Sequence, residues 1–234
     1  MKLTKLALAV GALALSGAAA AEFSANIGAT NNYIWRGVSQ TSNGAAVSGG
    51  LDYAHDSGFY AGTWASNIDW TGGTAGSGAE VDFYGGFASE VSGLGYDVGA
   101  IYYYYPTSGY DDSNFGEIYG TLSWGPVSGG IAYTVTSDVN DVSGTAQGFQ
   151  DGDLYYHVSA NFEVMPTWTV GGTIGYYDFE DNGDGGTDIN YTHYQVDVGK
   201  SAGDFGDFTF TVSKAEEESG SDDTLFVVSW AKTF

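Results

Sequence analysis

Apolar and polar side chains alternate along this chain in short segments, from Phe23 to the carboxyl terminus. Successive side chains of a β-strand point to opposite faces of its sheet, so this period of two predicts strands with one apolar face. Each segment is about ten residues long, a length typical of strands that cross a membrane. Twelve such segments cover residues 23–36, 45–55, 59–70, 79–90, 95–106, 114–124, 127–136, 154–163, 168–178, 188–200, 207–215 and 224–234.

The connections between these segments alternate in length. Long ones such as "GVSQTSNG" and "FEDNGDGGT" follow short ones such as "HDSG" and "GP". Outer-membrane barrels have an even number of antiparallel strands, short periplasmic turns and long outer loops. We therefore predict an all-β fold, a transmembrane antiparallel up-and-down β-barrel of twelve strands over residues 22–234, with both ends of the barrel segment at short turns. The alternative, a soluble β-sandwich, leaves aromatic residues concentrated at strand ends unexplained.

The amino-terminal segment predicts export. Lys2 and Lys5 precede an uncharged apolar run, and an alanine-rich stretch ends at Ala21 in the form of a cleavage site. The run has about 15 residues, fewer than the roughly 20 that a spanning helix needs. We expect residues 1–21 to be a cleaved signal peptide and the mature protein to reach the bacterial outer membrane. No later stretch is long and apolar enough to span as a helix, so strands must make any crossing.

Charge and cysteine content exclude several classes of function. The chain has 29 acidic and six basic residues and no cysteine. Nucleic acid is therefore a poor partner and cations are favoured ones, while disulfides and thiolate metal sites are impossible. The loop "EDNGDGGTD" is rich in oxygen ligands, but the twelfth position counted from Glu180 is Tyr191 and not the glutamate of a calcium-binding loop. We expect no cofactor and no metal site.

The last ten residues, "LFVVSWAKTF", predict the final barrel strand and its assembly signal. One face carries Phe226, Val228, Trp230, Lys232 and Phe234. This end resembles the signal by which outer-membrane proteins reach the barrel-assembly machinery, although Lys232 occupies a position that is usually aromatic. A lysine there can extend its ammonium to the lipid headgroups.

The alternation also assigns side chains to the two faces of the barrel. The outward row is expected to include Tyr60, Trp64, Ile68 and Trp70 of segment 59–70, and the corresponding aliphatic and aromatic residues of the other segments. Counting by twos places Arg36, the only arginine, on the inward face near the outer rim, where its guanidinium could join opposing carboxylates and set the bore. Tyrosines 103, 105, 119 and 155 should crowd the same space. The predicted pore-lining residues are Arg36, Asp52, Glu80, Asp82, Asp97, Glu117, His157 and Asp197.

Several blocks of the sequence resemble a known family. The segments "SANIGATNNYIWRGVSQT" (24–41) and "GGLDYAHDSGFYAGTWASNIDW" (49–70) are similar to the TorF-type porin family, also described as a Gcw_chp domain. The blocks "YDVGAIYYYYP", "EIYGTLSWGPVSGG", "FTFTVSKA" and "VVSWAKTF" continue the resemblance over essentially the whole mature chain. The resemblance implies an outer-membrane β-barrel with channel activity, and it identifies no solute.

These observations favour a porin-like channel for passive diffusion of small hydrophilic solutes, with a cation preference that arises from an acidic lumen. The alternative is a non-conducting surface barrel whose acidic outer loops bind cations, lipopolysaccharide or a partner. A third hypothesis, a lipid-modifying enzyme built on His157 and Ser159, is disfavoured because residues two apart on a strand lie roughly 6–7 Å apart, beyond hydrogen-bond reach. Expected partners are outer-membrane lipid, lipopolysaccharide, small hydrophilic solutes and the assembly machinery.

Overall fold

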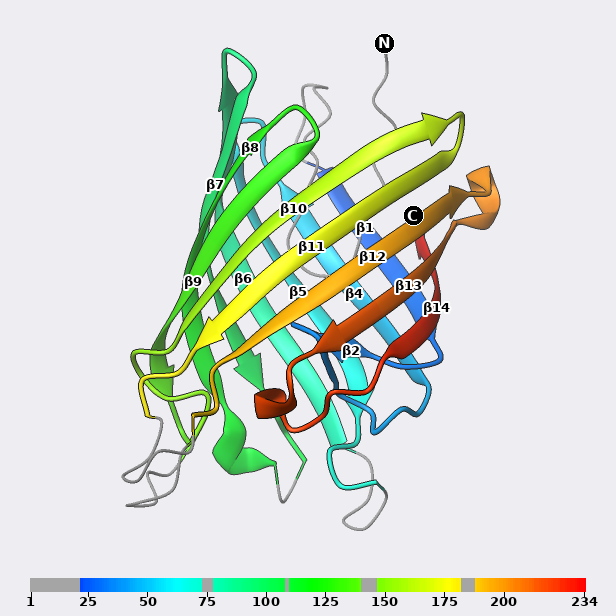
Figure 1. The fold of residues 1–234 in the computed structure, drawn as a ribbon. Helices are drawn as coiled ribbons and strands as arrows, with labels where there is room; N and C mark the ends of the chain where they lie inside the picture. Colours follow the sequence, from blue (N-terminus) through cyan, green and yellow to red (C-terminus); the bar gives the residue numbers. More distant parts are fainter. Residues whose placement is uncertain (1–21, 73–77, 108–109, 140–146, 182–187) are drawn as a thin grey trace.

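A closed antiparallel β-barrel of twelve strands forms the protein (Figure 1). The computed structural model describes residues 22–72, 78–107, 110–139, 147–181 and 188–234, so the predicted signal peptide lies outside the described residues. The barrel strands are β1 (Glu22–Thr30), β4 (Ala46–Ala54), β5 (Phe59–Ile68), β6 (Gly78–Val91), β7 (Leu94–Tyr104), β8 (Phe115–Trp124), β9 (Val127–Ser137), β10 (Leu154–Met165), β11 (Trp168–Asp178), β12 (Tyr191–Ser201), β13 (Asp207–Ala215) and β14 (Leu225–Thr233).

Each barrel strand pairs with its neighbour along the chain, and β1 closes the cylinder by pairing with both β4 and β14. In the register of the closing pair, Asn26 lies opposite Thr233 and Thr30 opposite Ser229. Closure leaves no free sheet edge, which a lipid environment requires because every backbone polar group must find a partner within the protein. The predicted fold class and strand number are confirmed.

The two ends of the barrel differ in the length of their connections. The short turns, such as 92–93 and 125–126, lie at one end, together with the start of β1 and the end of β14 (Figure 1). We call this the inner end, and the opposite end with the long connections the outer end. Short 3-10 turns occur at η1 (Asp111–Ser113), η2 (Gly203–Phe205) and η3 (Glu217–Ser219). Within the described ranges, no helix has the length and apolar character needed to cross a membrane.

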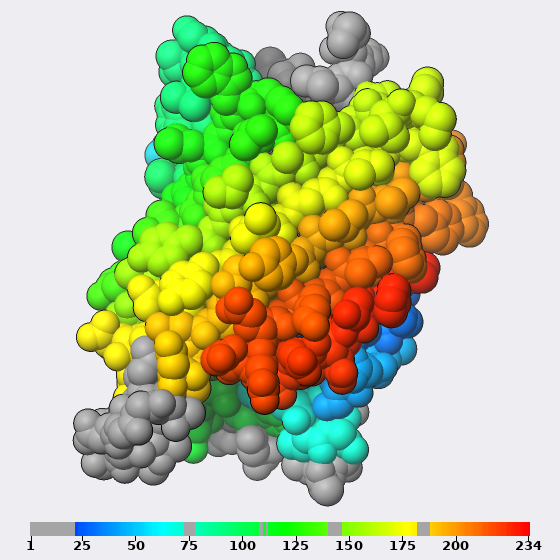
Figure 2. Space-filling model, viewed as in Figure 1, coloured from blue at the N-terminus to red at the C-terminus, as the bar shows by residue number. Residues whose placement is uncertain are grey.

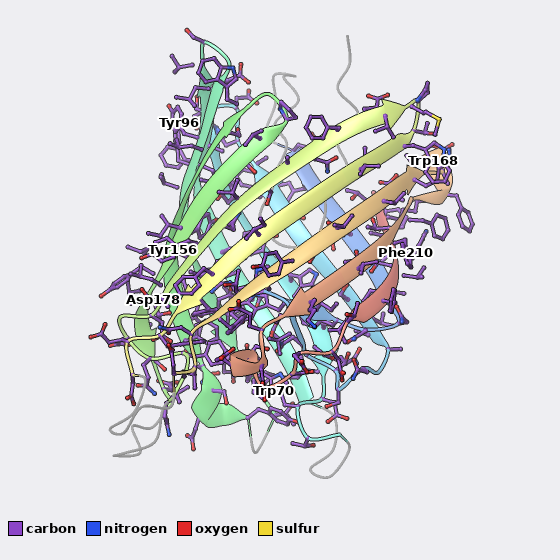
Figure 3. The ribbon with its side chains drawn as sticks, viewed as in Figure 1. Trp70, Tyr96, Tyr156, Trp168, Asp178 and Phe210 are labelled. Atoms are coloured by element: carbon purple, nitrogen blue, oxygen red, sulfur yellow. The ribbon has the colours of Figure 1, made fainter. Side chains whose placement is uncertain are left out.

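The outward face is apolar over most of its height. Phe83, Leu122 and Val158 point outward and are 50%, 58% and 60% exposed. Aromatic side chains project from the barrel near both ends, with Trp168 at the inner end and Tyr156 nearer the outer end (Figure 3). The space-filling view shows a continuous wall from β8 to β14 (Figure 2). An apolar band between two aromatic belts is the surface that lipid covers.

In one predicted strand, segment 59–70, the large apolar side chains face the lumen and not the lipid. Tyr60 and Ile68 of β5 are buried, with Tyr60 bonded to an inward carboxylate, and Trp64 packs on Tyr33 inside the barrel. The prediction that this row faces lipid was wrong. The outward residues of β5 include Phe59, but its middle positions hold small side chains, while the large ones fill the lumen. In a narrow barrel, large apolar side chains also pack the interior, so residue size does not mark the lipid face.

The segment predicted as a strand over 23–36 is also different in the structure. The wall strand β1 ends at Thr30, and the chain then turns into the barrel as a hairpin of β2 (Ile34–Trp35) and β3 (Val38–Ser39). Arg36 therefore reaches the lumen from an inserted loop and not from a wall strand. We call residues 31–45 the plug loop.

Candidate functional site

The plug loop enters the outer half of the lumen through a tight hairpin. Ile34 pairs with Ser39 and Trp35 with Val38, and the two residues of the turn, Arg36 and Gly37, have φ values of 47° and 86°. Two successive positive φ values fit a type I′ turn, in which glycine is favoured at the second position. A Cβ on Gly37 would lie 2.5 Å from the Cβ of His193 on β12. The tip of the hairpin therefore packs directly against the barrel wall.

Hydrogen bonds hold the base of the plug loop in place. The Gln40 amide donates to the Tyr33 carbonyl at 2.7 Å, and the Tyr33 amide donates to Thr41 Oγ1 at 3.1 Å. The loop is also joined to the chain after β5, because the Asp69 amide donates to the Gln40 carbonyl at 2.8 Å and Trp70 Nε1 donates to Gln40 Oε1 at 2.8 Å. The plug loop is thus a folded element with its own bonding pattern.

The guanidinium of Arg36 is held by a carboxylate and several rings. Its Nη1 and Nη2 donate to the two oxygens of Glu117 at 2.8 and 2.6 Å, a bidentate ion pair whose side chains are 10% and 2% exposed. Its Cζ lies 4.2 Å from the ring centroids of both Trp35 and Tyr155, and 5.1 Å from that of Tyr177. Burial disfavours the charge on Arg36, but the charge and hydrogen bonds of Glu117, together with Tyr177 and Tyr103, outweigh it and hold the pKa of the guanidinium well above its usual value. Arg36 is therefore a permanent cation in the lumen.

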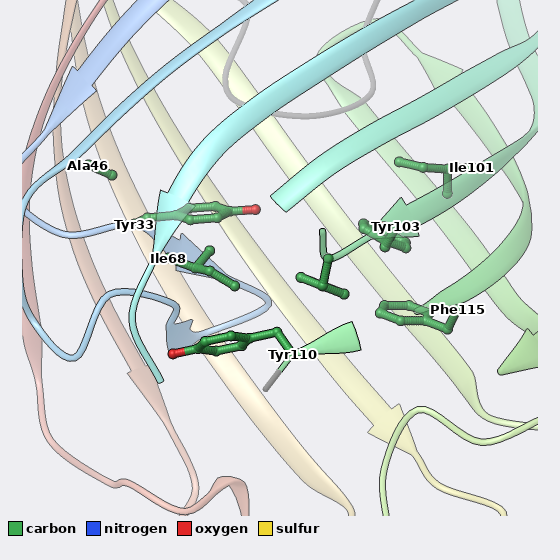
Figure 4. Packing of buried hydrophobic residues seen from close by; sticks show 8 residues of the cluster. Tyr33, Ala46, Ile68, Ile101, Tyr103, Tyr110 and Phe115 are labelled. Carbon is green, nitrogen blue, oxygen red and sulfur yellow. The ribbon is translucent and has the colours of Figure 1, made fainter. Parts of the chain in front are cut away.

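Aromatic rings from opposite walls meet at the plug loop. Trp35 contacts Tyr103 of β7, Phe115 of β8 and Tyr177 of β11, with ring centroids 5.7, 6.2 and 6.1 Å away. The surrounding cluster includes Tyr33, Ile68, Ile101 and Tyr110, shown in close view in Figure 4. The outer half of the lumen is packed with buried side chains.

Two further carboxylates lie beside this cluster on β6. Glu80 accepts hydrogen bonds from the hydroxyls of Tyr33 and Tyr105 at 2.7 and 3.0 Å. Burial and the Glu80 carboxylate raise the pKa of Tyr33 well above its usual value, so this hydroxyl keeps its proton and donates. Asp82 is fully buried, and neither of its carboxyl oxygens has a hydrogen-bond partner among the described residues.

Carboxylates line the inner half of the lumen, and each accepts hydrogen bonds from neutral side chains. Asp52 accepts from Asn26 and from Tyr84, Asp97 accepts from Tyr60 at 2.7 Å, and Asp197 accepts from Thr211 at 2.6 Å and from Gln195. Over the described ranges, the Arg36–Glu117 contact is the only ion pair. The negative charges of the inner half therefore have no basic partner there.

The structure brings the predicted pore residues together on the inside of the barrel. Asp52, Asp97, His157 and Asp197 lie in the inner half and in the middle, and Glu80, Asp82 and Glu117 lie in the outer half with Arg36. The guanidinium of Arg36 binds one carboxylate, that of Glu117, and does not bridge opposing carboxylates as the sequence suggested.

The terminal residues of the predicted assembly signal lie on the outside of the barrel. Phe226, Val228 and Phe234 are 61%, 55% and 68% exposed, and Trp230 is partly covered by the turn at Phe205, to which its Nε1 donates.

Sequence reasoning missed the residues that surround Arg36. Trp35, Tyr177 and Tyr191 were not assigned to the site, although Tyr191 donates a hydrogen bond to the Arg36 carbonyl at 3.1 Å. The pair Arg36-Gly37 carried a usable signal, because glycine is favoured at the second position of a two-residue hairpin turn. The loop "EDNGDGGTD", for which no calcium site was predicted, lies mostly within residues 182–187, outside the described residues. Elsewhere in the described chain no group of three or more His, Cys, Asp or Glu residues could hold a metal ion.

Comparison with solved structures finds outer-membrane porins. A KdgM porin superposes with a TM-score of 0.58 at 7% identity, covering 90% of this chain and 98% of the porin. A KdgM porin in complex with disordered oligogalacturonate gives 0.57 at 6% identity, with 92% and 98% covered. A NanC porin gives 0.53 at 11% identity, with 91% and 98% covered. At these identities the likeness concerns the fold.

No curated protein matches the sequence. A family model described as a bacterial protein of unknown function, Gcw_chp, matches residues 14–232, which is nearly the whole chain. The chain therefore belongs to the Gcw_chp family of bacterial proteins.

Proposed function

We propose that this protein is an outer-membrane channel of the TorF-type porins through which small hydrophilic solutes diffuse passively, with a preference for cations. The observation that carries the proposal is the charge inside the barrel. The carboxyl groups of Asp52, Glu80, Asp82, Asp97, Glu117 and Asp197 face the lumen, and over the described residues Arg36 is the one guanidinium. Low-dielectric walls of one charge sign concentrate counter-ions in a cleft.

The porin fold of the structural neighbours supports a channel, but their solutes need not be shared. One neighbour was solved in complex with oligogalacturonate, a polymer that carries carboxylates. An acidic lumen repels such a polyanion. We therefore infer that this chain differs from that neighbour in its solute and takes cationic or neutral molecules.

Reversal potentials in planar bilayers test the proposal. Under a salt gradient across purified protein, we expect stable unit currents and a potential that favours cations. The triple variant Asp52→Asn, Asp97→Asn, Asp197→Asn should reduce this preference, because it removes the three carboxylates of the inner half. Asp204→Asn in the exposed turn η2 removes one charge away from the lumen and should leave the preference unchanged. Anion-favouring currents in the wild-type protein would contradict the proposal.

A non-conducting surface barrel is the second candidate, and the packed outer half of the lumen favours it. A groove of about 520 Å³ at the outer end, lined by Tyr176, Asp188, Asn190, Tyr194, Lys214, Ala215, Glu216, Glu217, Glu218 and Asp222, supplies the acidic surface that this role needs. The carboxylates of this groove are suitable ligands for divalent cations, which would bridge the groove to lipopolysaccharide phosphates. Electrical silence of both the wild-type protein and a variant without the plug loop would favour this candidate.

An enzymatic role has little support in the geometry. The Ser159 hydroxyl is hydrogen-bonded to Thr173 Oγ1 at 2.9 Å, and His157 stacks on Tyr155 with 5.7 Å between ring centroids. A nucleophile needs its base within hydrogen-bond reach. We infer that the barrel is not a hydrolase, and a phospholipase assay of the purified protein in detergent tests this inference.

A further inference from the structure

The site that holds the Arg36 guanidinium is built mainly by the barrel wall. Glu117 of β8 supplies both carboxylate oxygens, Tyr155 of β10 and Tyr177 of β11 supply two ring faces, and the hydroxyl of Tyr103 on β7 donates to Glu117 at 3.3 Å. Trp35 is the one ring of the site that comes from the plug loop itself. We call the four wall residues Tyr103, Glu117, Tyr155 and Tyr177 the cation cage.

The chemistry of the cation cage suits a planar organic cation. A carboxylate that accepts two parallel N–H bonds matches the fork of a guanidinium. Aromatic faces within about 6 Å attract a cation through the ring quadrupole, and this attraction grows when water is excluded. Glu117 and Tyr177 are 2% and 0% exposed, so the cage excludes most water while Arg36 occupies it. Metal ions and small inorganic cations have no N–H donors, so they cannot form the two parallel bonds that the carboxylate of Glu117 accepts.

The occupant of the cage is attached to a short and separable element. The hairpin that carries Arg36 has only two residue pairs, and it forms a sheet of its own, apart from the barrel ladder. The plug loop begins after β1 and ends before β4, which are paired neighbours in the wall. Withdrawal of the hairpin therefore breaks side-chain contacts and the hydrogen bonds to the backbone carbonyls of Arg36 and Gln40, but no strand pairing of the barrel.

We propose that the cation cage is a binding site for solutes that carry a guanidinium group, and that Arg36 is a tethered occupant which such a solute displaces. This proposal rests on the proposed channel function and adds its substrate class. A solute that enters the cage releases Arg36. The plug loop then loses this contact with the wall and is free to leave the outer half of the lumen. A tethered group competes with an effective concentration that is typically millimolar for a short flexible link, so free solute binds tightly only when Arg36 is removed.

Binding of methylguanidine to the full-length mature protein in detergent tests the proposal without requiring conduction. We expect Arg36→Gln to bind methylguanidine with a Kd at least about tenfold lower than the wild-type protein, because the tethered competitor is gone. Adding Glu117→Gln to this variant should abolish the binding, since the paired carboxylate oxygens are lost. Lys200→Gln is the matched control, because it removes one positive charge at the inner end of β12, outside the cage, and should bind like the wild-type protein. Methylamine should bind more weakly than methylguanidine, because it lacks the planar fork.

A second substitution keeps the test decisive if Arg36→Gln does not fold, which heat-dependent migration on gels reveals. Arg36→Lys retains the charge but cannot form the bidentate pair, so methylguanidine should displace it at a lower concentration than it displaces Arg36. Equal affinity in the wild-type protein and the folded Arg36 variants would overturn the proposal, as would unchanged binding after Glu117→Gln. Conduction without methylguanidine binding would refute the cage and leave the channel intact. Binding by a barrel that never conducts would refute the channel and retain the cage.

Discussion

Replacing Glu117 with glutamine tests the energetic role of the ion pair inside the lumen. The substitution preserves the shape of the side chain and removes its charge. The Glu117 oxygens accept two bonds from Arg36 and one from Tyr103. A glutamine offers one acceptor oxygen, and its amide nitrogen, which is a donor, must face a donor of Arg36 or Tyr103.

We expect Glu117→Gln to lower the free energy of unfolding by about 3 kcal/mol, the lower end of the range for removing one partner of a buried ion pair. The pair is buried, at 10% and 2% exposure, so the guanidinium cannot recover its hydration without moving the plug loop. The loss stays at the lower end because the rings of Trp35 and Tyr155 remain at 4.2 Å from the charge.

Urea unfolding in detergent, followed by tryptophan fluorescence, measures this loss. Urea is preferred because a guanidinium denaturant would compete for the site. The double variant Arg36→Gln, Glu117→Gln should be about 2 kcal/mol more stable than the sum of the single losses predicts, because it leaves no unpaired charge. Glu163→Gln at the exposed inner end of β10 is the matched control. The reasoning is refuted if Glu117→Gln costs less than about 1 kcal/mol, or if the two losses add.

Three further outcomes follow from single positions. Gly37→Ala should lower the free energy of unfolding by about 1–3 kcal/mol, because φ is 86° and the new Cβ meets His193; equal urea midpoints would contradict this. Burial raises the pKa of Asp153 to about 6, so the folded protein binds this proton more tightly than the unfolded chain, and stability from this group rises as pH falls through about 6 toward 4. Asp153→Asn should flatten the pH dependence of the melting temperature between about pH 6 and 4, and an unchanged slope would contradict the assignment of this dependence to Asp153. Deleting Phe234, whose backbone pairs with Ala25, should reduce folded protein in the outer-membrane fraction, whereas Phe234→Tyr should not.

The wall of the barrel was predictable because a strand that separates lipid from a lumen must alternate. On β6 and β10, Phe83 and Val158 face outward while Asp82 and His157 face inward, and the period of two reveals this directly. The number of strands followed from the same pattern, since each crossing needs about ten residues and each turn has a recognisable composition.

The inside of the barrel was less predictable because its packing is set by contacts between distant residues. Alternation gives the parity of a strand only if its two faces differ in polarity, and β5 has apolar residues on both, with Phe59 outward and Ile68 inward. The position of Arg36 depends on Glu117, 81 residues away in the chain. No local pattern encodes such a partner, so only the turn-forming pair Arg36-Gly37 hinted that the chain leaves the wall.

The attachment of the plug loop has a consequence for engineering. Its two ends join the neighbouring strands β1 and β4 at Thr30 and Ala46, which lie opposite each other in the register of this pair. The span from 32 to 45 can therefore be exchanged for a tight turn, or for a loop of different chemistry, while Asn31 is kept because its backbone amide and its side chain bond to β14. The barrel wall and the plug loop are thus separable, so one barrel can carry different loops inside its lumen.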